Sequence, residues 1–454
     1  MIKKEELIAY MEKGSYKPMA AQELINSLGI DDIQGFLRLL NTLEKDGRIV
    51  FTRKHRYGLP ERMGLVIGRL HGNRKGFGFV IPNDPVCRDI HISLDNMNGA
   101  MHNDRVMVRL NHSRKAHPEG EVIRVLERAN NQVVGTFEKS KNFGFVVPDD
   151  TRIYHDVFIP LGEEEEAGNF DKVVVEITRW PQKHRSPEGR VVEVLGRSGM
   201  PGVDILSIIR KFNLPLEFPK KVLKVVDVIP QEVTEGDLEG RRDLRSLKTV
   251  TIDGADAKDL DDAISIDLLA NGNYALWVHI ADVSYYVRED GVLDREAYKR
   301  ANSVYLVDRV VPMLPSGLSN GICSLNAGVD RLAVSVMMEV DGQGNVVRHD
   351  VCQSVINVDE RMTYDNVRKL LQEDVPELWE RYSDLGNEFK WMQELCDILK
   401  KKRSRRGSMD FDFPEGKAIL DQEGTPTDIV RVDRSIAENI IEEFMILTNE
   451  TIAE

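Results

Sequence analysis

The sequence is poor in cysteine and contains no long apolar run. Its four cysteines lie far apart without a CxxC pair, so neither a zinc cluster nor a disulfide framework is indicated. We expect them to be buried thiols in a reducing compartment. No apolar stretch is long enough to span a membrane, and acidic residues interrupt the N-terminal region where a signal peptide would be apolar. The expected location is the cytoplasm, without membrane contact.

An overall excess of basic residues, which is common in nucleic-acid-binding proteins, is also missing, because the net charge is −14. The charge is nevertheless unevenly distributed. Residues 1–128 hold 21 Lys+Arg against 16 Asp+Glu, whereas the rest of the chain holds 40 against 59. The N-terminal part is therefore the candidate for nucleic-acid binding.

The most unusual stretch is 253–262, in which five of ten residues are aspartate. Alternating apolar and polar residues at 247–252, 263–267 and 274–283 predict β-strands around it, so the acidic residues are expected at strand ends. Two like charges about 4 Å apart repel by roughly 4 kcal/mol at an effective dielectric near 20, and a bound cation would relieve this repulsion. Carboxylate oxygens suit Mg²⁺ or Mn²⁺ better than zinc.

A calcium loop of the EF-hand type is excluded for this stretch. Counted from Asp253, the sixth position is Lys258 rather than glycine and the twelfth is Ile264 rather than glutamate. The residues alone leave two interpretations open, a metal site and a solvated surface loop.

Residues 63 to about 200 contain an internal repeat. The segment KGFGFV at 75–80 recurs as NFGFV at 142–146, and DIHI at 89–92 recurs as DVFI at 156–159. Several short strands with glycine turns in each copy predict two small β-barrels, at 63–130 and 131–200. These motifs resemble the nucleic-acid motifs of cold-shock domains, which are barrels of the oligonucleotide-binding (OB) fold.

The aromatic residues of the repeat are candidates for RNA binding. Strand alternation would place both phenylalanines of a copy on one face, where stacked bases contribute roughly 1–3 kcal/mol each; the alternative is that the rings face the barrel core. The candidate RNA-binding residues are Lys75, Phe77, Phe79 and His91 in the first copy and Phe143 and Phe145 in the second. Asn142 replaces the lysine and residues 163–166 are acidic, so the first barrel is expected to bind RNA more strongly.

The regions that flank the repeat predict helices. Residues 1–60 predict three helices and a two-stranded hairpin, the order of a winged helix, which would contact either nucleic acid or protein. Basic residues at 53–56, at the tip of the hairpin, favour nucleic acid. Residues 377–402 predict one long helix that ends in a basic run at 400–406, which would face solvent or follow RNA phosphates.

Several motifs, in their order along the chain, resemble the ribonuclease II/RNB family of 3′-to-5′ exoribonucleases. They are Thr249–Asp253, Asp259–Ala263, His279–Ser284, Ser303–Tyr305, Val311–Pro315, Leu318–Asn320 and Ile441–Met445. The N-terminal arrangement is closer to the ribonuclease R branch of that family than to the ribonuclease II branch. The resemblance implies a multidomain α+β protein with a winged helix, two OB-fold barrels, a connecting segment at 201–240 and a partial α/β catalytic domain of the ribonuclease II type at 241–454.

The resemblance also implies the chemistry. Asp253, Asp259, Asp261 and Asp262 match the catalytic aspartates that hold Mg²⁺ or Mn²⁺, and the aromatic clamp on the last bases of the strand falls on Tyr305 and Phe411. The implied activity is processive, metal-dependent hydrolysis of single-stranded and structured RNA from its 3′ end to 5′-mononucleotides. RNA is the implied partner, with the ribosome or other RNA-decay proteins as further ones, and a monomer is expected.

The family pattern continues past Glu454, into an arginine-bearing catalytic segment and a further RNA-binding barrel, so an incomplete catalytic domain is expected. A non-catalytic RNA-binding or chaperone protein is therefore an alternative, although such a protein has no need of four matched aspartates. A DNA-binding regulator is a second alternative. Arg38 is the sole charged residue at 33–43, which counts against a DNA-recognition helix.

Overall fold

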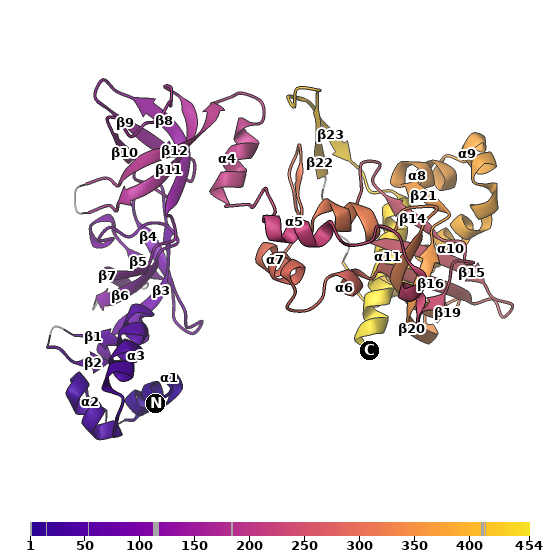
Figure 1. The fold of residues 1–454 in the computed structure, drawn as a ribbon. Coiled ribbons are helices and arrows are strands. Elements are labelled where there is room, and N and C mark those ends of the chain that lie inside the picture. Colours follow the sequence, from indigo (N-terminus) through magenta and orange to yellow (C-terminus); the bar gives the residue numbers. More distant parts are fainter. Residues whose placement is uncertain are drawn as a thin grey trace. The chain divides into compact units, whose positions relative to one another are not determined.

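The chain is represented by a computed structural model that describes residues 2–14, 16–52, 54–111, 118–182, 185–409, 413 and 415–454. Contacts divide the chain into two compact units, residues 1–214 and 215–454, and each is described by itself (Figure 1). None of the described helices is both long and apolar enough to cross a membrane.

The first unit begins with a small helical domain. Its elements are α1 (Lys4–Glu12), α2 (Ala21–Leu28), α3 (Ile33–Lys45), β1 (Val50–Phe51), β2 (Tyr57–Gly58) and the 3-10 turn η1 (Glu61–Met63). Leu7, Leu24 and Leu40, one from each helix, are fully buried because apolar residues recur at helical spacing. The order of elements is that of a winged helix. In the basic hairpin tip, Arg56 forms an ion pair with Glu23 of α2 at 3.0 Å. Arg53 lies outside the described residues.

The two copies of the repeat form two closed five-stranded barrels with the same strand order (Figure 1). The first contains β3 (Leu65–Gly72), β4 (Gly78–Pro82), β5 (Ile90–Ile92), β6 (Arg105–Asn111) and β7 (Glu119–Glu127), with the turn η2 (Leu94–Asn96). The second contains β8 (Gln132–Lys139), β9 (Phe143–Pro148), β10 (Val157–Pro160), β11 (Asp171–Arg179) and β12 (Glu188–Arg197), and α4 (Val203–Lys211) packs against it.

A pair of glycines explains why the repeat keeps its barrel geometry. A Cβ at Gly68 would lie 2.2 Å from the carbonyl oxygen of Ile81, and a Cβ at Gly135 would lie 2.2 Å from that of Val147. The first strand of each barrel therefore crosses the second so closely that only glycine fits.

The second unit is built on a seven-stranded mixed sheet with the order β13-β20-β19-β16-β15-β14-β21. The strands are β13 (Arg242–Asp243), β14 (Val250–Asp253), β15 (Asp262–Leu268), β16 (Tyr274–Ala281), β19 (Asp330–Val340), β20 (Val346–Asn357) and β21 (Glu360–Thr363). Smaller elements are α5 (Lys220–Val226), η3 (Glu235–Leu238), α6 (Val283–Tyr286), α7 (Val292–Arg300), β17 (Val304–Tyr305), β18 (Val310–Val311), the π-helical turn η4 (Gly317–Ile322), β22 (Glu415–Leu420) and β23 (Pro426–Val432).

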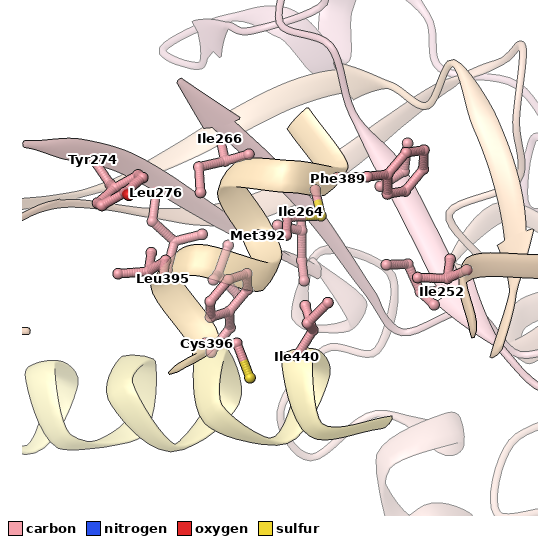
Figure 2. Packing of buried hydrophobic residues seen from close by; sticks show 14 of the residues in the cluster. Ile252, Ile264, Ile266, Tyr274, Leu276, Phe389, Met392, Leu395, Cys396 and Ile440 are labelled. Atoms are coloured by element: carbon pink, nitrogen blue, oxygen red, sulfur yellow. The ribbon is translucent and has the colours of Figure 1, made fainter. Parts of the chain in front are cut away.

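Helices cover one face of this sheet and enclose the main core. They are α8 (Tyr364–Gln372), α9 (Pro376–Arg381), α10 (Gly386–Arg405) and α11 (Ile436–Ala453). Ile264 and Leu276 of the sheet lie in one cluster with Phe389 and Met392 of α10 and Ile440 of α11 (Figure 2). Alternate residues of β15 and β16 thus face the helices, as the period-2 pattern of their sequence requires.

Buried polar side chains cross the sheet in one chain of contacts. The oxygens of Thr249 and Ser265 lie 2.8 Å apart, and Ser265 Oγ lies 3.1 Å from His279 Nε2. The other ring nitrogen, Nδ1, lies 2.6 Å from Ser335 Oγ, which lies 2.6 Å from Ser354 Oγ. Burial lowers the pKa of His279 to about 3, so the ring is neutral. A one-residue slip of any strand would leave these groups without partners, and the contacts therefore fix the register.

The structure corrects one expectation about the C-terminal helices. The predicted helix at 377–402 is interrupted by the turn η5 (Ser383–Leu385), where serine and aspartate compete with the helical backbone. Within the basic run, Arg403 pairs with Glu443 at 3.0 Å and Arg406 pairs with Glu450 at 2.5 Å, whereas Lys401 and Arg405 are exposed.

The expectation of four buried thiols is also wrong. Cys323 and Cys396 are buried, but Cys87 is exposed because it lies in the loop between β4 and β5, and Cys352 is partly exposed.

Candidate active site and RNA-binding surfaces

The four predicted catalytic aspartates gather at one edge of the large sheet. Asp253 ends β14 and Asp262 begins β15, and because these neighbouring strands are antiparallel, with Val250 opposite Ile264, both ends lie at the same edge. The loop 254–261 joins them and carries Asp259 and Asp261. The expectation that the acidic stretch lies between two strands is thus confirmed.

Burial and mutual repulsion disfavour the charged form of these carboxyl groups. The pKa of Asp253 is raised to about 6, first by burial and then by Asp262, while Arg361 opposes the change. The pKa of Asp262 is also raised to about 6, by burial and by Asp261. Burial and Asp259 raise the pKa of Asp261. Without a counter-cation, the site therefore stores electrostatic repulsion.

The donor set fits a divalent cation. Asp253 Oδ2 is buried and accepts no hydrogen bond among the described residues, so this oxygen is available to coordinate a cation. Its neighbours are carboxylates, the oxygen ligands that Mg²⁺ and Mn²⁺ prefer. In the described part of the chain, no three His, Cys, Asp or Glu side chains are already arranged around a common metal position.

The loop between the aspartates is held by residues far away in the sequence. Ser324 Oγ accepts a hydrogen bond from the backbone N–H of Leu260 at 3.1 Å and donates one to the carbonyl of Lys258 at 3.0 Å. Leu260 itself is buried, and the backbone N–H of Ala281 donates to the carbonyl of Asp261 at 2.9 Å. Arg361 holds the first half of the loop. Sequence reasoning missed Ser324 and Arg361, because neither belongs to the acidic stretch.

The predicted aromatic clamp is only partly described. Tyr305 lies in the β17–β18 hairpin with 66% of its surface exposed, and its hydroxyl donates a hydrogen bond to Asp259 Oδ2 at 2.7 Å. This bond, more than burial, raises the pKa of Tyr305 to about 12. The hairpin thus brings an exposed ring to the edge of the acidic site. Phe411 lies outside the described residues.

Each barrel carries a cluster of three rings on its outer surface. In the first barrel, Phe77, Phe79 and His91 have ring centroids 5.5–5.9 Å apart. The cluster forms because Phe79 pairs with His91 across β4 and β5, and Phe77 comes two residues before Phe79. Gly78 and Val80, which alternate with these rings, are buried. The interpretation that the phenylalanines face the barrel core is therefore wrong.

The second barrel repeats this geometry closely. Phe143, Phe145 and Phe158 have ring centroids 5.5–5.8 Å apart, and Phe145 pairs with Phe158 as Phe79 does with His91. Phe158 was missing from the predicted site, although the match between DIHI and DVFI contains the signal for it.

The surroundings of the two clusters differ in charge. Lys75 is exposed in the turn before β4 of the first barrel. In the second barrel, the exposed Glu163, Glu165 and Glu166 follow β10, and Glu164 lies 4.0 Å from Lys139. The exposed Lys141 lies two residues before Phe143, as Lys75 lies two residues before Phe77, so the predicted loss of the lysine in the second copy is wrong. The two aromatic surfaces differ instead in the acids that follow β10.

Three families match consecutive parts of the chain. The family described as "Ribonuclease B OB domain" matches residues 68–125, "Cold shock domain" matches 145–219, and "RNB domain" matches 241–454. The fold and the acidic edge thus define a protein in which OB-type barrels precede a carboxylate-bearing α/β domain.

Comparison with whole proteins gives relatives that match nearly the full chain. A ribonuclease R from Thermotoga maritima is 43% identical over 462 residues, which covers 100% of this chain and 64% of that protein. Mycoplasma genitalium RNase R in complex with ribose-methylated single-stranded RNA has a similar structure, with a TM-score of 0.79, 28% identity, and coverage of 86% of this chain and 61% of that one. The same protein in complex with double-stranded RNA matches with a TM-score of 0.68, 28% identity, and coverage of 78% and 60%.

The chain carries an RNB domain at residues 241–454, and over its whole length it is similar to ribonuclease R. It spans less than two thirds of the length of the relatives just described.

Proposed function

We propose that the chain provides RNA capture and the metal-holding site of a 3′-to-5′ exoribonuclease that hydrolyses RNA processively to 5′-mononucleotides. The observation that carries the proposal is the group of carboxylates at the β14–β15 edge, whose raised pKa values and unpartnered buried oxygen at Asp253 call for a cation. A protein that only binds RNA has no use for such a costly arrangement.

Asp253, Asp259, Asp261 and Asp262 are the proposed holders of Mg²⁺ or Mn²⁺. When bound, such a cation activates water and neutralises charge on the phosphate and on the leaving 3′ oxygen. In the hydrolysis, a water oxygen forms a bond to phosphorus, the bond from phosphorus to the 3′ oxygen of the preceding nucleotide breaks, and that oxygen gains a proton. The product is a nucleoside 5′-monophosphate.

Tyr305 is the proposed stacking partner for a terminal base. Its ring is exposed and its hydroxyl is already fixed by Asp259 at 2.7 Å, so a base that stacks on it is positioned relative to the acidic edge. Stacking accepts every base, which suits an enzyme that removes nucleotides regardless of sequence.

The three-ring clusters of the barrels are the proposed surfaces that hold the body of the strand. The similar Mycoplasma genitalium RNase R forms complexes with single-stranded and with double-stranded RNA. This supports the proposal that both single-stranded and structured RNA are substrates. The ribosome and other RNA-decay proteins are further proposed partners. We also propose that the protein is a monomer, and a measurement of its mass by light scattering would test this.

The direct test is a denaturing gel of 5′-labelled single-stranded RNA incubated with the chain in Mg²⁺, in Mn²⁺ and in EDTA. We expect a metal-dependent ladder that shortens from the 3′ end and ends in mononucleotides, and its absence from the Asp261→Asn variant. Asp256→Asn is the matched control: Asp256 lies in the same acidic stretch, but its side chain is 82% exposed, so the ladder should persist.

The second candidate function is RNA binding without cleavage, which the two ring clusters favour because they suffice for it. It predicts intact RNA in Mg²⁺ together with a mobility shift on a native gel. That outcome would refute the hydrolytic function for this chain.

A further inference from the structure

Arg361 lies beside the acidic loop although it is about a hundred residues away in the sequence. It belongs to β21, which runs parallel to β14 with Thr251 opposite Arg361 and Asp253 opposite Thr363. Its neighbour Met362 is fully buried, so alternation points Arg361 to the exposed side of the sheet.

A single guanidinium nitrogen of Arg361 serves three carbonyl groups of the loop. Its Nη2 atom donates to the carbonyls of Gly254 at 3.4 Å, Ala255 at 3.1 Å and Ala257 at 2.6 Å. Across the described residues, these are the side-chain hydrogen bonds that reach the carbonyls of 254–257. Because the three oxygens converge on one cation, the backbone between them is bent into an arc.

This arc separates the two ends of the acidic group. Asp253 lies immediately before it and Asp259 two residues after it, and Ser324 holds the second half of the loop through Lys258 and Leu260. The positions of the two aspartates relative to each other therefore depend on the shape that Arg361 gives to the first half.

We propose that Arg361 is a positioning residue of the acidic site, which shapes the loop so that Asp253 and Asp259 can hold the same divalent cation. The proposal rests on the proposed metal-dependent function for the cation, and on the three hydrogen bonds for the geometry. Loss of a partner that orients metal ligands in this way typically weakens metal binding by about 10- to 100-fold.

The test compares Arg361→Gln, Arg361→Lys and the control Arg368→Gln. Glutamine removes the charge and the reach of the guanidinium, whereas the lysine ammonium keeps three donors for the three carbonyls. Arg368 is a second surface arginine of this unit whose partners are Asp365 and Glu373 rather than the loop. Its replacement changes the net charge equally.

Two readouts are measured, and neither depends on catalysis. Calorimetric titration with Mn²⁺ should show about 10- to 100-fold weaker binding for Arg361→Gln, a smaller loss for Arg361→Lys, and unchanged binding for the control. Hydrogen–deuterium exchange without metal should be faster in the peptide that covers 254–261 of Arg361→Gln, and unchanged in the control.

Unchanged Mn²⁺ affinity and unchanged exchange in Arg361→Gln would overturn the proposal. So would a variant that loses only RNA affinity in EDTA, because Arg361 would then contact a phosphate instead of shaping the loop. If the wild type cleaves RNA and Arg361→Gln binds Mn²⁺ as tightly as the wild type, the proposed function stands and this inference is refuted. Weakened Mn²⁺ binding in a chain that never cleaves RNA would support the inference and refute the function.

Discussion

The barrels and the large sheet present their candidate functional side chains in opposite ways. The barrels place aromatic rings on outer strand faces, and the two copies agree closely in ring geometry. The sheet instead collects carboxylates at a partly buried edge, where repulsion raises their pKa values. Stacking surfaces thus cost the fold little, whereas the acidic edge is unfavourable until a cation binds. The proposed function places RNA capture on the first kind of surface and hydrolysis at the second.

The largest effect is expected from Asp262→Asn. Loss of a residue that merely orients a metal ligand costs about 10- to 100-fold, so loss of a proposed ligand should lower the cleavage rate by at least about 100-fold. The dissociation constant for RNA in EDTA should stay within about twofold of the wild-type value, because the barrels are untouched. Gel assays and fluorescence anisotropy measure the two quantities. A parallel loss of RNA affinity would break the division between capture and hydrolysis.

A smaller effect is expected from the double variant Phe77→Ala/Phe79→Ala. Taking the two adjoining rings as the platform for one base, we expect their removal to cost roughly 1–3 kcal/mol, so RNA affinity should fall by about 10- to 100-fold. Mn²⁺ affinity should not change. The measurement is fluorescence anisotropy of a labelled single strand in EDTA, and unchanged affinity would exclude the ring cluster as an RNA surface.

The corresponding change in the second barrel, Phe143→Ala/Phe145→Ala, sharpens the comparison further. We expect a loss of less than about tenfold, because the glutamates that follow β10 repel phosphate and weaken RNA binding at this surface. The same anisotropy titration provides the check. An equal or larger loss than in the first barrel would show that charge does not set the order of the two surfaces.

The smallest effect concerns stability. The pKa of Asp262 rises from 3.8 to about 6 on folding, so the folded state binds more protons than the unfolded state between about pH 4 and 6. This carboxyl therefore lowers the free energy of unfolding as pH rises through that window, by about 1–3 kcal/mol. Thermal unfolding of the unit that holds the acidic site can be recognised because Mg²⁺ shifts its midpoint in the wild type. In EDTA at pH 7.5, this midpoint should be higher in Asp262→Asn than in the wild type, and the difference should be smaller at pH 4.5. A lower midpoint at pH 7.5 would contradict the stored repulsion.

Local sequence patterns predicted much of the fold because the features concerned are short-range. Alternation predicted β14, β15 and β16 around the acidic stretch, and the repeat predicted two barrels of one topology. The same alternation predicted that Phe77 and Phe79 lie on one face of the strand. It could not predict which face, because that depends on Gly78 and Val80 filling the barrel interior.

The supports of the candidate site could not be predicted in this way. Arg361 and Ser324 reach the acidic loop only because β21 and the turn after η4 are brought beside it by the sheet. The ion pairs that occupy Arg56 and Arg403 are also long-range, so exposed cations and bound cations look alike in the sequence.

The most direct test of the division between capture and hydrolysis is the single-turnover cleavage rate at saturating protein, measured side by side for Phe77→Ala/Phe79→Ala and Asp262→Asn. We predict that saturation restores the wild-type rate to the barrel variant, because only capture is impaired. Asp262→Asn should remain at least about 100-fold slower than the wild type at every concentration. A barrel variant that stays slow at saturation, or an Asp262→Asn variant that is rescued by it, would contradict this division.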